Sequence, residues 1–316
     1  MASGTPTRVL ALDIGGTKLA AGVVDGAGRV HSFVTRPSRT ERGVDEVLEE
    51  LFAVGRAALE ASDDDGAEID AIGIGCGGPL DADSGILLAP PHLPGWRDVP
   101  VTSLAAREYG VPATLENDAT AAAAGEHRWG AGSGTRNMVY LTLSTGVGGG
   151  VVIDGRLYRG ASGNGGELGH VTVDWRGRPC RGCGRRGCLE AYVSGTSIAE
   201  RAQEAGLEVS TAEEVTSAAR TGDPRAVAVW EETLAALACG VISIVNLFEP
   251  ELVVIGGGVS RAGEQLLAPL RERVRAGAMR PAGEAVRIVR SALGDHVGVV
   301  GAAAIVYERA ALDGNG

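Results

Sequence analysis

Two widely separated stretches of this chain share one pattern: an apolar strand, a turn that contains glycine, and a second apolar strand. The first reads LDIGGTKLAAGVVDG over residues 12–26, and the second reads LTLSTGVGGGVVIDG over residues 141–155. Aligned without gaps, both end in an apolar pair followed by Asp-Gly, and each has the pattern of a β-hairpin. A single match of this kind can arise by chance. A chain built as two related lobes is the structure that such a match would indicate.

The length and the order of the predicted elements lead to the same expectation. With 316 residues, the chain is longer than one ordinary domain. Strands alternate with helices, as in layered α/β proteins, so we expect two α/β lobes with a glycine-lined cleft between them. Beyond the hairpins, the pattern predicts strands at residues 69–75, 252–255 and 286–289, and helices at residues 43–61, 101–109, 119–126, 197–205, 212–220, 224–246 and 298–312.

The composition excludes several classes of partner. Twenty-nine Lys and Arg face 40 Asp and Glu, a net charge of −11, and no long basic run interrupts the acidic balance. Nucleic acid and anionic membranes are therefore poor partners. Residues 1–7 do not resemble a secretion signal, and no apolar run approaches about 18 residues. We expect a soluble, cytoplasmic protein.

The turn of the first hairpin has the chemistry of a phosphate and metal site. Gly15 and Gly16 can present backbone N–H groups to phosphate oxygens without a Cβ in the way. Thr17 and Lys18 add a hydroxyl and a cation. Asp13, at the end of the strand, suits Mg²⁺, which binds few carboxylates and keeps its waters. The alternative interpretation is an ordinary hairpin turn.

Two further glycine clusters could complete a nucleotide site. Thr145 and Gly146 lie in the turn of the second hairpin, and two facing loops of this kind could hold one triphosphate. Gly257 and Gly258 follow the strand predicted at residues 252–255 and precede a helix, which is where nucleotides often bind in α/β folds. We expect this third cluster to lie near adenosine.

Four side chains within a short segment have the composition of a zinc site. His170, Cys180, Cys183 and Cys188 offer one imidazole and three thiolates. This set fits a closed, tetrahedral, structural Zn²⁺ site with no bound water to activate. Such a site would make rigid a loop that has few apolar residues of its own.

Seven motifs are spread over nearly the whole chain: DIGGTK at 13–18, GCGGPLD at 75–81, LPGW at 93–96, ENDA at 116–119, STGVGGG at 144–150, GELGH at 166–170 and CRGCGRRGCLE at 180–190. In this order they resemble the sugar kinases of the ROK family, named for its repressors, open reading frames and kinases. The resemblance implies the two-lobed actin-like ATPase (ribonuclease H-like) fold with a central nucleotide and sugar cleft. It also implies a small lobe at 1–117 plus 299–316 and a large lobe at 118–298.

The resemblance also assigns roles to individual residues. It makes Asp118 the general base that takes the proton of the attacking sugar hydroxyl, a role that a carboxylate can fill in phosphoryl transfer. The alternative role for Asp118 is the N-cap of the helix that follows it, and both roles could hold together. The residues that the resemblance implies as sugar contacts are Gly78, Asn117, Glu167, His170 and Glu190, with Asp118 itself.

The activity implied is ATP-dependent phosphorylation of a hexose, glucose first, at the 6-hydroxyl, with Mg²⁺ and ATP. An N-acetylmannosamine or N-acetylglucosamine kinase is the nearest alternative, and polyphosphate as donor is a weaker one. A sugar-sensing repressor is the rival of another class. It is disfavoured because about seven residues precede the first strand, and that is too few for a helix-turn-helix module. The resemblance also suggests a homodimer or homotetramer.

The sequence departs from the family pattern at three places. Two residues separate Cys180 from Cys183, where one is usual, so Cys180 could approach a metal differently. His92 stands where glucokinases of the family often have Asn, and Gly77 stands in place of a frequent Pro. Because the last two changes lie near the expected sugar pocket, they weaken the case for glucose in particular.

Overall fold

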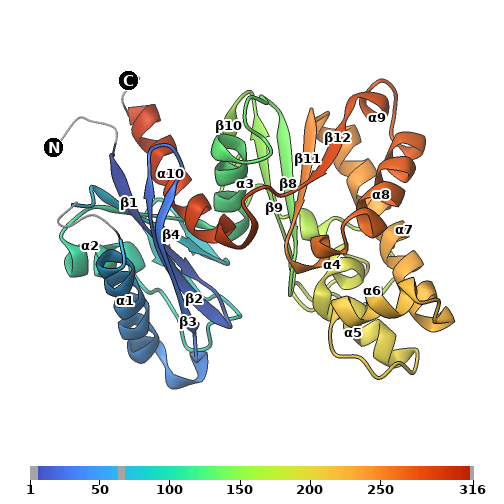
Figure 1. Cartoon of the computed structure of the whole chain (residues 1–316), viewed down its shortest axis with the longest axis horizontal. Helices are drawn as coiled ribbons and strands as arrows, with labels where there is room; N and C mark the ends of the chain where they lie inside the picture. The colour runs from blue at the N-terminus through green and yellow to red at the C-terminus, as the bar shows by residue number, and fades with distance from the viewer. Residues whose placement is uncertain (1–5, 63–67, 314–316) are drawn as a thin grey trace. The chain divides into compact units, whose positions relative to one another are not determined.

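The two predicted hairpins each form the centre of a separate five-stranded sheet. The computed structural model describes residues 6–62 and 68–313, and the chain divides into two compact units, residues 1–133 with 293–316 and residues 134–292. The lobe boundaries predicted from the sequence, at 117/118 and 298/299, stay a prediction. Figure 1 labels the elements along the chain.

The first unit is a mixed sheet with helices on both faces. Its strand order is β3-β2-β1-β4-β7, with β1 antiparallel to β2 and parallel to β4. The strands are β1 (Arg8–Ile14), β2 (Lys18–Asp25), β3 (Val30–Pro37), β4 (Ala71–Cys76) and β7 (Ala113–Asn117), with a small β5 (Leu80–Asp81) and β6 (Ile86–Leu87) ladder apart from them. The helices are α1 (Val44–Glu60), α2 (Val101–Tyr109), α3 (Asp118–Trp129) and α10 (Val297–Asp313).

Alternation along β1 explains why helices cover both faces. Leu10, Leu12 and Ile14 point into a core shared with α1 and α2, because successive side chains of a strand point to opposite faces. The intervening residues are also buried, and α10 packs against β1 and β4 and beside α3 (Figure 1). The fold therefore buries both faces of the central strands, as mixed α/β sheets do.

The second unit repeats this strand order with different helices. Its order is β10-β9-β8-β11-β12, and the directions of β8, β9 and β11 match those of β1, β2 and β4. The strands are β8 (Met138–Leu143), β9 (Val147–Ile153), β10 (Arg156–Leu157), β11 (Leu252–Gly256) and β12 (Arg287–Arg290). The helices are α4 (Glu190–Val193), α5 (Gly195–Glu204), α6 (Ala212–Arg220), α7 (Pro224–Phe248), α8 (Glu264–Gly277) and α9 (Ala282–Ala285).

The shared topology explains the likeness of the two hairpins and corrects its register. Ile14 pairs with Leu19 across the first turn, whereas Leu143 pairs with Val147 across the second. The second turn is thus one residue shorter, and the ungapped alignment is out of register after it. The matching Asp-Gly pairs at 25–26 and 154–155 are consequently not equivalent positions.

Helix α7 fills the core of the second unit. Asp223 caps it and Pro224 occupies its first turn, positions that favour helix initiation. By length and hydropathy it could cross a membrane, and it is the one such helix among residues 6–62 and 68–313. Its side chains Val229, Leu237 and Ile244 instead belong to the buried core cluster.

Glycine permits the closest helix packing in the first unit. A Cβ at Gly125 in α3 would lie 3.0 Å from Cα of Gly301 in α10, and one at Gly301 would lie 2.6 Å from the backbone of Ala121. In β4, a Cβ at Gly73 would overlap the carbonyl of Ala302. Side chains at these positions would force the helices apart.

We expect Gly73→Ala to lower the free energy of unfolding by about 3 kcal/mol, because overpacking against backbone cannot be relieved by a rotamer change. Gly26→Ala is the matched control, since its Cβ would meet only Cε1 of Tyr307 at an ordinary 3.7 Å. Chemical denaturation of the two variants measures the difference. Equal stability would show that β4 and α10 are less tightly packed than described.

Candidate functional site

The polar residues predicted as a site fall into one group in each unit. The first unit holds Asp13, Gly15, Gly16, Thr17, Lys18, Gly78, Asn117 and Asp118, and the second holds Thr145, Gly146, Glu167, His170, Cys180, Cys183, Cys188, Glu190, Gly257 and Gly258. Each group lies around strand ends and the turns that follow them. We describe the groups separately.

The glycine turn of the first unit is held by contacts that leave its tip exposed. The N–H of Gly15 donates to the carbonyl of Lys18 across the turn, at 3.0 Å. The hydroxyl of Ser38 donates to the carbonyl of Gly16, at 2.6 Å. Thr17 and Lys18 remain exposed, so their side chains are available to a ligand. Ser38 had no recognisable signal in the sequence, because it lies after β3 and outside any motif.

Asp118 lies at the first position of α3, and its neighbour Asn117 is the N-cap. The Oδ1 of Asn117 accepts from the N–H groups of Ala119 and Thr120, at 3.0 and 3.2 Å. The Oδ1 of Asp118 also accepts from the N–H of Ala119, at 2.8 Å. The cap at the start of α3 is therefore provided chiefly by Asn117, which alone reaches the N–H of Thr120.

The charge of Asp118 acts on the carboxyl group of Asp13. Burial raises the pKa of Asp13 to about 7, the charge of Asp118 adds to the rise, and Lys18 opposes it. Asp118 is an exposed residue, yet loss of hydration to the protein atoms around its carboxyl group raises its pKa as well. Two such carboxylates attract a cation or share a proton.

In the second unit, Glu190 joins the glycine turn to the cysteine loop. Its Oε2 accepts from the N–H of Val147, at 3.0 Å, and its Oε1 accepts from the N–H of Gly182, at 3.2 Å. The thiol of Cys180 lies 3.3 Å from the same Oε1. A Cβ at position 146 would lie 2.9 Å from Oε2, so a side chain there would displace the Glu190 carboxylate.

His170 and the three cysteines come together as the sequence predicts. The ligand atoms of His170, Cys180, Cys183 and Cys188 all lie within 4.8 Å of one another. Sγ of Cys183 is 3.5 Å from Sγ of Cys188, and Sγ of Cys180 is 3.7 Å from Nδ1 of His170. These separations suit four ligands around one ion at Zn–S distances of about 2.3 Å. The four residues form a possible metal site.

The two nitrogens of the His170 imidazole face different groups. Nδ1 faces the thiols, while Nε2 is 4.0 Å from Oε2 of Glu167. A metal held through Nδ1 would therefore fix the ring and leave Nε2 beside Glu167, as ligands of this kind commonly do.

The third glycine cluster packs against the second hairpin. Gly257 has φ +79°, and a Cβ there would lie 2.4–2.7 Å from backbone atoms of Leu143, the last residue of β8. The structure thus brings the clusters at 144–150 and 256–258 together within the second unit. A cavity of about 170 Å³ adjoins this cluster and is lined by Ala212, Glu213, Thr216, Ser217, Arg220, Gly258, Val259, Arg261, Ala262 and Gln265.

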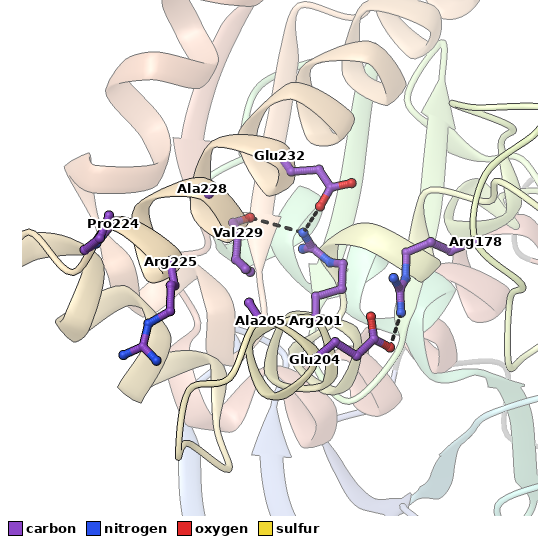
Figure 2. Close-up of a pocket in the computed structure, with 9 residues that line it drawn as sticks. All are labelled: Arg178, Arg201, Glu204, Ala205, Pro224, Arg225, Ala228, Val229 and Glu232. Carbon is purple, nitrogen blue, oxygen red and sulfur yellow. Dashed lines mark hydrogen bonds and ion pairs between the residues drawn. The ribbon is translucent and has the colours of Figure 1, made fainter.

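A second cavity, of about 480 Å³, is lined by residues of α5, of α7 and of the cysteine loop (Figure 2), and one of them is a residue that the sequence gave no reason to select. Arg201 in α5 is buried, and its guanidinium donates to the carbonyls of Tyr192 and Val229, to the hydroxyl of Thr233 and to Glu232. It therefore joins α4, which begins at Glu190, to α5 and α7. Arg178, in the cysteine loop, pairs with Glu204 at the edge of the same cavity.

Each unit is an α/β layer built on a hairpin with a glycine turn, and carboxylates and a thiol cluster lie beside the turns. This arrangement defines a protein of two α/β lobes, each with polar side chains around a glycine turn. Residues 9–309 match the ROK family, and the chain belongs to that family, whose structures have the actin-like ATPase fold.

Three relatives illustrate the match. A glucokinase from Thermotoga maritima is 40% identical, with 96% of this chain and 98% of that protein covered. The crystal structure of a ROK hexokinase from Thermus thermophilus is 38% identical, with a TM-score of 0.81 over 97% of this chain and 99% of that one. A ROK family glucokinase from Streptomyces griseus, in complex with glucose and AMPPNP, is 34% identical, with a TM-score of 0.81 over 94% and 98%.

We expect Arg201→Ala to lower the free energy of unfolding by about 3 kcal/mol, because Glu232, Thr233 and the Tyr192 carbonyl lose a buried donor. Arg225→Ala is the matched control: it lines the same cavity but its guanidinium is exposed beside Asp223, so the unfolding temperature should hardly change. Thermal unfolding of both variants tests this. If both lose the same stability, Arg201 does not carry the network.

Proposed function

We propose that this protein transfers the terminal phosphoryl group of ATP to the 6-hydroxyl of a hexose, with glucose as the first candidate. The observation that carries the proposal is Asp118, a carboxylate at the start of α3 that Asn117 relieves of capping. Relatives support the proposal, because those compared above are a glucokinase, a hexokinase and a glucokinase whose structure contains glucose and an ATP analogue.

Asp118 would accept the proton of the attacking hydroxyl. Phosphoryl transfer passes through a loose transition state, so that alignment and neutralisation of charge contribute most of the acceleration. A carboxylate whose pKa is raised is a stronger base than an ordinary one while it is ionised. The oxygen of Asp118 that Ala119 does not occupy is the one available to the sugar.

Asp13, Gly15, Gly16, Thr17 and Lys18 would hold the nucleotide phosphates and their Mg²⁺. The fit of Asp13 to a cation follows from its raised pKa, since a half-buried carboxylate near the charge of Asp118 gains from an added positive charge. Mg²⁺ supplies neutralisation of the phosphate oxygens when bound. Thr145 and Gly146 would add contacts to the phosphates, and the cavity beside Gly257 and Gly258 would take adenosine.

Recognition of the sugar would fall to carboxylate, imidazole and amide groups. Glu167, His170 and Glu190 offer acceptors and a donor to hydroxyl groups. Asn117 has its amide nitrogen near Gly78, where a Cβ would lie 3.9 Å from Nδ2, so a ring could meet the amide and the Gly78 backbone together. Zn²⁺ is the ion we infer for His170 and the three cysteines, with a structural role.

The reaction would take place in the cytoplasm, where ATP is available. The five cysteines are free thiols, in keeping with a reducing compartment. We infer that the protein has no need of nucleic acid or membrane for this chemistry. A homodimer or homotetramer stays a prediction from the family resemblance.

Asp118→Asn should lower kcat by roughly 100-fold to 10,000-fold in a coupled ADP-release assay across glucose, mannose, fructose and the N-acetylhexosamines. Asp45→Asn, at an exposed carboxylate in α1, is the control and should keep full activity. Stability should not fall, because Asn117 holds the cap. Full turnover of Asp118→Asn on the best sugar would show that another group is the base.

The same substitution has a pH-dependent effect on stability. Because folding raises the pKa of Asp118, its ionisation destabilises the folded chain as pH rises above the unfolded pKa of about 3.9. Asp118→Asn should therefore be at least as stable as the parent at pH 8, with a smaller difference at pH 4. Thermal unfolding at the two pH values provides the comparison.

Removal of the metal should weaken the second unit. We expect about one zinc per chain by elemental analysis, most of it lost in Cys183→Ser, with a fall in unfolding temperature of roughly 5 °C or more. Cys239→Ser is the matched control, because Cys239 is also exposed but lies outside the cluster. Retention of zinc by Cys183→Ser, or its absence from the parent, would contradict the assignment.

A further inference from the structure

His92 occupies a narrow space between two glycines of the first unit. A Cβ at Gly16 would lie 3.1 Å from Cβ of His92, and a Cβ at Gly77 would lie 2.7 Å from Cε1 and 3.3 Å from Nδ1 of the ring. The backbone here is held in place by Leu93 and Trp96, which are buried in the core cluster that α1 and α2 share. The imidazole is therefore positioned and is not a free surface group.

The surroundings of the ring leave part of its hydrogen-bonding capacity unused. Nε2 lies 3.8 Å from Sγ of Cys76, and within the described residues Nδ1 has no hydrogen-bond partner. Burial lowers the pKa of His92, while the charge of Asp118 opposes that effect. A neutral imidazole offers one donor and one acceptor, which suits a hydroxyl group better than a phosphate.

The two departures from the family pattern therefore belong together. Any side chain at position 77 would meet the imidazole of His92, because the nearest ring atom is only 2.7 Å from the Cβ site. Gly77 leaves the space that the ring fills. Asn at position 92 would be shorter and would leave this space empty.

We propose that His92 contacts the hexose hydroxyls and helps to determine which sugar is accepted, and that Gly77 makes room for its ring. The inference rests on the proposed function, since Asp118 is there the group that receives the proton of the sugar. It adds a residue to the sugar site and couples two positions, 77 and 92, because the ring of His92 fills the space that a side chain at position 77 would need.

A double-mutant cycle between Gly77→Ala and His92→Asn tests the coupling. Gly77→Ala should lower kcat/KM for the best sugar by about tenfold in the parent, because the methyl displaces the ring, and by less than about twofold in the His92→Asn background. Gly26→Ala, outside the site, should have the same small effect in both backgrounds. An equal loss from Gly77→Ala in the two backgrounds would overturn the coupling.

His92→Asn alone separates a substrate contact from a structural role. We expect KM for the sugar to rise by roughly three- to tenfold, as for the loss of one hydrogen bond, and KM for ATP to stay within about twofold. The ranking of glucose, mannose and the N-acetylhexosamines should change. An unchanged sugar KM and an unchanged ranking would refute the assignment to specificity.

A binding measurement keeps this inference distinct from the proposed function. The chain has five histidines, so the imidazole signals of the ¹⁵N-labelled protein can be assigned by comparison with His92→Asn. Addition of glucose or another hexose without ATP should shift the His92 signal. If no sugar is phosphorylated, the proposed function fails, while a shifted signal still supports the contact. A signal that no hexose of the panel moves overturns it.

Discussion

The hydrogen bonds that Asn117 makes to the start of α3 are the constraint on which the rest of the first unit's chemistry depends. A helix start needs a cap, and an Asp in the first turn is often used for one. Here the cap is Asn117, so the carboxylate that follows it is not needed to close the helix start. A single-residue shift of the cap would give that task to Asp118, and the proposed role of its carboxylate depends on the two adjacent polar residues having different tasks.

The carboxylate pair illustrates the tension between stability and function. Ionising Asp13 within the folded unit is unfavourable, because burial and the charge of Asp118 both raise its pKa. The free energy of unfolding therefore falls as pH rises from the unfolded pKa towards about 7. Lys18 offsets only part of this. Residues that destabilise a fold in this way commonly belong to functional sites.

The sequence revealed local structure better than contacts between distant residues. The helices at Val101–Tyr109 and Ala212–Arg220 are confirmed at their predicted bounds, because Gly110 and the Thr211 capping box mark their ends. The cluster of His170 and three cysteines could also be predicted, since its four ligands lie close together in sequence. The register of the second hairpin could not be predicted, because a turn shortened by one residue leaves the apolar pattern intact.

Ser38 and Arg201 show why other contributors escaped notice. Each donates hydrogen bonds to groups that its own sequence neighbourhood does not indicate. Ser38 donates to the carbonyl of Gly16, and Arg201 donates to the carbonyl of Tyr192 and to Glu232. An isolated Ser or Arg carries no periodic or motif signal, and its importance appears only when burial and hydrogen bonds are known. His92 and Gly77 could be noticed as departures from a family pattern, but their closeness in space appears only in the structure.

Glu126 shows the same dependence on distant partners at the boundary of the first unit. It is fully buried in α3, and its Oε2 accepts from the N–H of Ala131 while its Oε1 accepts from the N–H of Leu293, at 2.8 and 3.0 Å. The chain leaves the first unit just after residue 133 and re-enters it at residue 293. One buried carboxylate therefore holds the first unit's end of both covalent connections, because it accepts from a backbone N–H at each of these half-buried places.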